Sequence, residues 1–78
     1  MSEISKKDQK IIFEAKCNGT PIFVFTAKDA LSIDAISEYY LQCKKNGCNS
    51  QHIEEIQERI KEFSDWQTQN PAKVKLPD

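Results

Sequence analysis

A short apolar run, PIFVFTA at residues 21–27, is the only stretch of the chain with strong β character. Ile22 and Val24 alternate with Phe23 and Phe25, so both faces of an extended segment would be apolar. One strand cannot stand alone, because its backbone donors and acceptors need partners. The pattern therefore predicts a central strand, covered on both sides, around which the rest of the chain is organised.

Two amphipathic helices are predicted after this strand. The first begins at a Ser32 cap and ends near Asn46, with Gly47 as a left-handed terminator. Its apolar stripe consists of Ile33, Ile36, Tyr39 or Tyr40, and Cys43. The second begins at Asn49 or Ser50 and ends before Pro71. Its apolar ridge consists of Ile53, Ile56, Ile60, Phe63 and Trp66. Because the loop between them is short, the two helices are expected to form an antiparallel hairpin.

Residues 5–17 fit two interpretations. Ser5 is a suitable N-cap, and Asn18-Gly19 followed by Pro21 is typical of a helix end, which indicates a helix. Asn18-Gly19 is also a strong two-residue turn signal, so residues 11–13 could instead form a strand that pairs with residues 21–26. We favour the helix, because most of the other residues here are poor strand formers, namely Lys6, Lys7, Asp8, Gln9, Lys10, Glu14, Ala15 and Lys16.

The C-terminal residues 72–76 alternate apolar and basic side chains, which is typical of a short edge strand beside residues 21–27. The element order would then be α-β-α-α-β, an α+β fold in a single domain over residues 1–78. Residues 1–4 and 77–78 are expected to be frayed. If the tail does not pair, the central strand is expected to pair with its copy in another subunit.

Charge and hydropathy exclude several classes of partner. The chain has 11 basic and 12 acidic residues among 78, with no basic surplus for a nucleic-acid backbone or an anionic lipid surface. No apolar run is long enough to span a bilayer, and no apolar core follows the N-terminal charges, so no signal peptide is expected. We therefore expect a cytoplasmic protein, and its small core favours a homodimer or larger homo-oligomer.

Cysteine and histidine offer the only candidate chemistry. Three cysteines without an export signal are expected to be reduced thiols. Cys17, Cys43, Cys48 and His52 form a weak candidate zinc set, because no C-x2-C pair is present. A Cys48–His52 dyad has no evident orienting group or oxyanion hole. We expect neither an enzyme nor a bound cofactor.

A helix-turn-helix interpretation of the predicted hairpin is disfavoured, because its second helix would turn acidic residues toward DNA. That outer face carries Gln51, Glu54, Glu55, Glu58 and Glu62. Nucleic acid is therefore not an expected partner.

The turn Lys28-Asp29 is the candidate ligand site, because it lies between a predicted strand end and a helix start, where anions can meet helix amides. Tyr39 and Tyr40 are adjacent on a helix and cannot both point inward, so one of them could rim this site or an interface. Trp66, near its helix end, is a further candidate interface residue.

Several stretches resemble a group of small uncharacterised proteins of bacteriophages, prophages and mobile elements. The similar pieces are PIFVFTAKD at residues 21–29, the helix with Tyr39-Tyr40, the Gly47-Cys48 junction, and the ending VKLPD at residues 74–78. The resemblance covers residues 21–78 and implies an origin but no chemistry, so no functional residue is carried over.

We therefore expect a non-catalytic binding or accessory protein of a mobile element that acts through protein–protein contacts. Two alternatives remain open. One is a protein that sequesters a small anionic, nucleotide-like ligand, and the other is a zinc-stabilised module.

Overall fold

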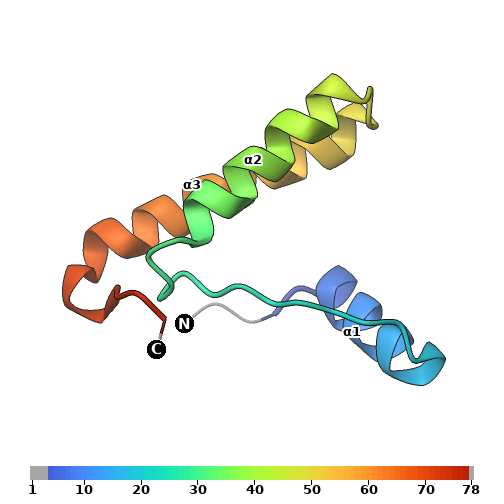
Figure 1. The fold of residues 1–78 in the computed structure, drawn as a ribbon, viewed down its shortest axis with the longest axis horizontal. Coiled ribbons are helices and arrows are strands. Elements are labelled where there is room, and N and C mark those ends of the chain that lie inside the picture. Colours follow the sequence, from blue (N-terminus) through green and yellow to red (C-terminus); the bar gives the residue numbers. More distant parts are fainter. Residues whose placement is uncertain (1–3, 78) are drawn as a thin grey trace.

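A computed structural model describes residues 4–77 and contains three α-helices and one short 3-10 turn (Figure 1). The helices are α1 (Lys6–Asn18), α2 (Ser32–Lys45) and α3 (Ser50–Gln69), and the 3-10 turn η1 spans Pro71–Lys73. The expected fraying at residues 1–4 and 77–78 falls largely on residues 1–3 and 78, which lie outside the described residues. None of the helices within residues 4–77 combines the length and the apolar character needed to cross a membrane.

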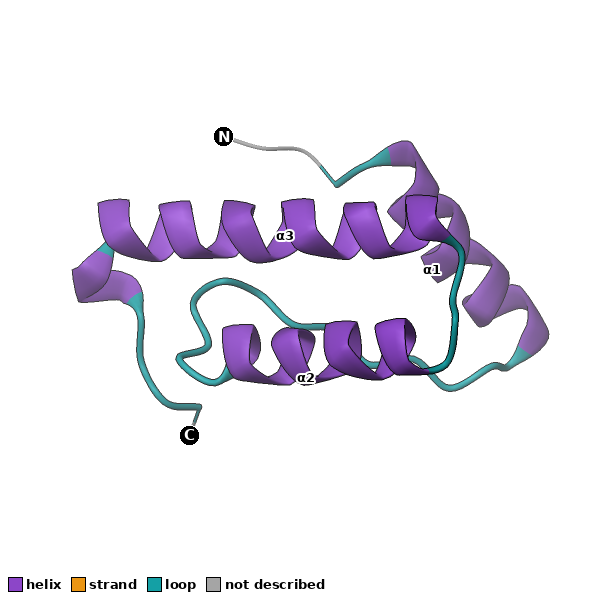
Figure 2. Cartoon of the chain, turned by 90° about the horizontal axis from the view of Figure 1, so that it is seen from above, coloured by secondary structure: helices purple, strands orange, loops and turns teal. Residues whose placement is uncertain are grey.

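Helices α2 and α3 form the predicted antiparallel hairpin (Figure 2). Helix α2 ends at Lys45 and is followed by Gly47, which has a left-handed φ of 68°; the Cys48 N–H donates to the Cys43 carbonyl over 3.0 Å. The Asn49 side chain then caps α3 by accepting a 2.8 Å hydrogen bond from the Gln51 N–H. The core lies between these two helices, where Cys43 and Ile56 are buried.

Helix α1 confirms the helical interpretation of residues 5–17. The Ser5 hydroxyl caps it by accepting from the Asp8 N–H over 3.1 Å, and Gly19 ends it with a φ of 66°. The hairpin interpretation is wrong, because residues 11–13 lie inside this helix. Helix α1 contains no buried residue, so it contributes almost nothing to the core.

The central strand and the α+β fold class are wrong. Residues 20–26, which we call the arm, run back from α1 toward α2 as an extended connection, and the part of the chain described by the structure contains no strand or sheet (Figure 1). Alternation and β-propensity indicate only that the side chains suit a pleated surface. A strand also needs a neighbouring segment that pairs with its backbone N–H and C=O groups. No segment within residues 4–77 pairs with the arm, and Phe23 is 79% exposed rather than covered.

The C-terminal tail contacts the turn that follows the arm, not residues 21–27. The Lys75 N–H donates to the Lys28 carbonyl over 3.0 Å, and the Lys75 carbonyl accepts from the Ala30 N–H over 2.9 Å. These two bonds form one isolated parallel bridge between Asp29 and Lys75. The predicted edge strand is therefore reduced to a single point of attachment beside the start of α2.

Candidate protein-binding surface

An apolar groove of about 450 Å³ lies between α1 and the arm. Its α1 side is formed by Ile11 and Ile12, and its arm side by Ile22, Phe23 and Val24. All five side chains are exposed, with Phe23 at 79% and Val24 at 64%. We call these five residues the α1–arm surface. Contiguous exposed apolar side chains are the feature from which an interaction site is inferred, so this surface is the candidate binding site.

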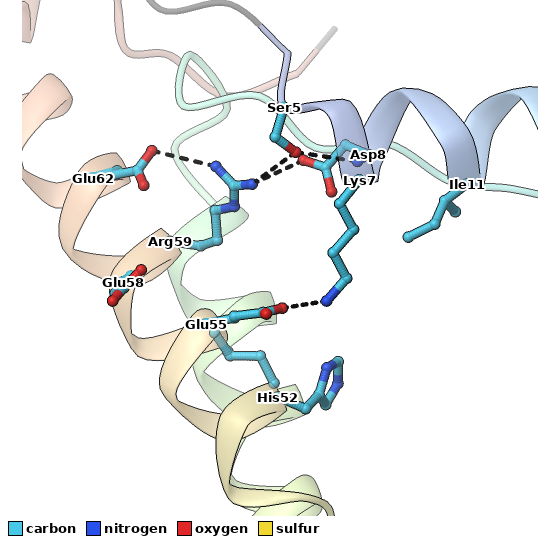
Figure 3. Close-up of a pocket in the computed structure, with 10 residues that line it drawn as sticks. Ser5, Lys7, Asp8, Ile11, His52, Glu55, Glu58, Arg59 and Glu62 are labelled. Atoms are coloured by element: carbon cyan, nitrogen blue, oxygen red, sulfur yellow. Dashed lines mark hydrogen bonds and ion pairs between the residues drawn. The ribbon is translucent and has the colours of Figure 1, made fainter.

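The α1–arm surface is bordered by ionic contacts between α1 and α3 (Figure 3). The Arg59 guanidinium donates to the Asp8 carboxylate over 3.0 Å and to the Ser5 hydroxyl over 3.3 Å, and it also pairs with Glu62 over 3.4 Å. Lys7 forms a second ion pair with Glu55, one turn away on α3. These contacts orient α1 against the hairpin, although partly exposed ion pairs stabilise by only about 0–1 kcal/mol each.

The Lys7 ammonium also changes the titration of Glu55. Its hydrogen bond and positive charge hold the pKa of the Glu55 carboxyl below its usual value, with smaller contributions from His52 and Arg59. Glu55 is therefore ionised over a wider pH range than a free glutamate, which keeps the Lys7–Glu55 contact ionic at neutral pH.

The turn Lys28-Asp29 has a structural role at the start of α2. The Asp29 carboxylate accepts from the Leu31 N–H over 2.8 Å, and the Asp29 carbonyl accepts from the Ser32 hydroxyl over 2.7 Å. The Gln67 amide of α3 reaches across to donate to the Ala27 carbonyl over 3.0 Å. Asp29 is thus used in local hydrogen bonds that fix the end of the arm against the hairpin.

Of the predicted ligand-site residues, the structure brings Lys28 and Trp66 together and separates the two tyrosines from them. Lys28 and Trp66 line a hollow of about 360 Å³ together with Phe25, Phe63 and Arg59. Neither tyrosine lines it. The Tyr39 hydroxyl lies 3.1 Å from Nε2 of His52, and the Tyr40 hydroxyl accepts from Gln57 over 2.7 Å. The expected pocket at Lys28-Asp29 with a tyrosine rim is therefore not formed.

The candidate zinc ligands are dispersed. Cys17 is exposed in the last turn of α1, Cys43 is buried in the hairpin, and Cys48 is exposed at the hairpin loop; all three are free thiols. Within residues 4–77, no three His, Cys, Asp or Glu side chains gather as a metal site would require. The hydrogen bond with the Cys43 side chain raises the pKa of the Cys48 thiol, which lowers its reactive thiolate fraction at neutral pH.

None of the five residues of the α1–arm surface is among the site residues predicted from the sequence, and neither are Arg59, Asp8 and Gln67, which hold α1 and the arm to the hairpin. The sequence contains no local signal for Gln67, since its partners lie some forty positions earlier. Arg59 shares the largely acidic face of α3 with Lys61, so the sequence does not single it out.

Comparison with known proteins adds no relative. The chain matches no protein-family model, no curated protein and no solved structure.

Proposed function

We propose that this protein is non-catalytic and acts through protein–protein contacts made by the α1–arm surface. The observation that supports the proposal is the exposure of Ile11, Ile12, Ile22, Phe23 and Val24 around one groove. Leaving these side chains in water forfeits the free energy of burying them, about 25 cal/mol per Å² of apolar surface. A polypeptide that covers the groove would recover that free energy.

The composition of the surface favours a protein as the occupant. Protein interfaces have an apolar, aromatic-rich centre and a polar rim with arginine enriched. Phe23 supplies an aromatic side chain to this groove, and Asp8 and Arg59 line the same groove. A chain with a net charge of −1 offers little electrostatic attraction for nucleic acid or an anionic membrane.

The mobile-element setting is a separate part of the proposal. It is supported only by the resemblance of residues 21–78 to small phage and prophage proteins, and it stays a prediction.

Photo-crosslinking in cells tests the role of the surface. A benzophenone amino acid placed at position 23 is expected to form a covalent adduct with a polypeptide when irradiated. The same amino acid at position 41 is the control, because Leu41 is 56% exposed and lies on α2 outside the groove. If position 23 gives no adduct, or if both positions give the same adducts, the α1–arm surface is not the binding surface.

A second candidate function is the binding of a small anionic, nucleotide-like ligand in the hollow beside Trp66. It is favoured by three aromatic side chains, Phe25, Phe63 and Trp66, that share this hollow with the cation Lys28. Arg59 and Glu62 also line the hollow, and the Arg59 guanidinium there pairs with Glu62 and with Asp8. Aromatic rings stack on bases and cations pair with phosphates. Trp66 is the chain's single tryptophan, so its fluorescence reports directly on this hollow. Titration with nucleotides should quench that fluorescence in the wild type and much less in Lys28→Glu; an unchanged spectrum would exclude this function.

A further inference from the structure

We propose that the occupant of the α1–arm surface is a second copy of this chain, so that the protein is a symmetric homodimer. This inference rests on the proposed function and names the partner of the same surface. It is supported by the surface area of the single chain, by the packing of α1, by the unpaired backbone of the arm, and by the shape and charge of the surface.

The surface area of one chain exceeds that of a compact monomer. The chain exposes 6603 Å², whereas a folded protein of 9.0 kDa exposes about 4900 Å². The excess of about 1700 Å² is larger than the roughly 800 Å² that each partner contributes to a standard interface. The Cα radius of gyration agrees, since it is 13.7 Å against about 11.5 Å for a compact chain of this length. One interface of ordinary size would remove about half of this excess.

Helix α1 needs a partner to be stable. It has 13 residues, none of them buried, and an isolated helix of fewer than about 12–15 residues is marginal in water. The ion pairs of Asp8 and Lys7 with α3 are partly exposed and supply little of the missing free energy. A partner must therefore cover α1 whenever the chain is folded. A second copy of the chain is the one partner that is always present with the first.

The backbone of the arm also has hydrogen-bonding groups without partners. Within residues 4–77, the N–H and C=O groups of Ile22, Phe23, Val24 and Phe25 take part in no hydrogen bond. An extended segment with unpaired backbone groups between exposed apolar side chains readily associates with another chain. Pro21 lacks an N–H and marks the beginning of this free stretch.

The shape and charge of the surface suit a two-fold arrangement. Such a dimer uses the same surface on both partners, so each surface must offer both a projection and a recess. Phe23 projects and is 79% exposed, and it stands beside the apolar groove of about 450 Å³. A net charge of −1 per chain means that bringing two copies together costs little electrostatic repulsion.

Sedimentation equilibrium of the purified protein from about 1 to about 100 μM tests the inference, because this range brackets a micromolar dissociation constant. The wild type is expected to show twice the chain mass of 9.0 kDa. Phe23→Glu should weaken association by about 30-fold or more, the effect of losing a central aromatic residue at an interface. The matched control, Leu41→Glu, adds the same charge at an exposed apolar position outside the groove and should leave association unchanged.

Hydrogen exchange on the wild type gives a readout that does not depend on a variant folding. Amides of the arm and α1 should exchange more slowly at high than at low concentration, whereas those of the α2–α3 core should not respond. A wild type that is monomeric at the highest concentration, or a dimer that Phe23→Glu leaves intact, overturns the inference. If the purified chain is a monomer while position 23 crosslinks to a different protein in cells, the second-copy inference fails and the proposed function stands. If no adduct forms at all, both fail.

Discussion

The Arg59 guanidinium donates a 3.0 Å hydrogen bond to the Asp8 carboxylate, and this ion pair joins the first turn of α1 to the middle of α3. Both side chains are partly exposed, Arg59 at 42% and Asp8 at 45%. Because α1 buries no residue, this pair and its neighbour Lys7–Glu55 set the direction in which α1 and the arm leave the hairpin. The groove that we propose as a binding surface therefore depends on weak polar contacts for its shape.

Removing the Asp8 carboxylate should free α1 while leaving the hairpin nearly intact. Asp8→Ala is expected to lower the free energy of unfolding by only about 0.5–1 kcal/mol, since the pair is screened by water and the carboxylate also favours the first turn of the helix. Amide hydrogen exchange in α1 should accelerate several-fold, and exchange in α2 and α3 should not.

The control for this experiment is Asp65→Ala, which breaks a more exposed ion pair with Lys61 within α3. The Lys61–Asp65 pair spans 2.8 Å and does not involve α1. If Asp65→Ala loosens α1 as much as Asp8→Ala does, the Arg59–Asp8 contact does not position the helix.

The stability contributed by Glu55 should depend on pH in a defined direction. Hydrogen bonding and charge from Lys7 make the pKa of Glu55 lower in the folded chain than in the unfolded chain. The contribution is therefore fully present above the unfolded pKa, about 4.3, and is lost as the pH falls through the lower, folded pKa. An NMR titration of the Glu55 carboxyl carbon measures this shift.

Replacing the neighbouring charge checks the cause of that shift. Lys7→Gln should return the Glu55 pKa toward its ordinary value, and added salt should act in the same direction by screening. Lys6→Gln removes an equal charge that makes no contact with Glu55 and should have little effect. A Glu55 carboxyl that titrates identically in both variants would exclude Lys7 as the cause.

The α2–α3 hairpin was predictable because its signals are local. The three- and four-residue spacing from Ile53 to Trp66, the Asn49 cap and the Gly47 terminator all act within a few residues, and each predicted feature is present in the structure. The ends of α2 and α3 lie close to those that the sequence patterns predict. The predicted Ser32 cap is wrong, however, because Leu31 is the N-cap of α2 and the Ser32 hydroxyl donates to the Asp29 carbonyl instead.

The arm and the candidate site could not be predicted in this way, because they depend on distant residues. The alternation of Ile22 to Phe25 is typical of a strand, yet whether a strand forms depends on a neighbour that no segment of residues 4–77 supplies. Lys28-Asp29 was assigned to a ligand site from its place between a supposed strand and a helix. Its actual partners include Gln67 and Lys75, far along the chain. Because no strand precedes Lys28-Asp29, the reason for predicting a ligand site there does not apply.

Glycine at position 47 should be required for the hairpin loop. Its φ of 68° lies in the left-handed region, and a Cβ at this position would meet no atom within 4 Å. The cost of Gly47→Ala is therefore confined to the backbone and should be about 1–2 kcal/mol. Gly47→Asn should cost less, because asparagine adopts this conformation more readily. Urea unfolding measures the difference, and equal stability of the alanine variant and the wild type would contradict the left-handed geometry.

Gln67 should fix the end of the arm to the hairpin. Its side-chain amide donates to the Ala27 carbonyl over 3.0 Å and lies 3.4 Å from the Asp29 carbonyl, so Gln67→Ala leaves both acceptors without this donor. We expect a loss of about 1 kcal/mol in the free energy of unfolding and faster exchange of the Ala30 and Lys75 amides, whose hydrogen bonds hold the tail to the same turn. Gln69→Ala, at an exposed position on the same helix, is the matched control and should change neither quantity. If Gln67→Ala lowers stability without affecting those two amides, the side chain supports α3 alone. The turn that follows the arm would then be fixed by the Asp29–Lys75 bridge and the hydrogen bonds at the start of α2.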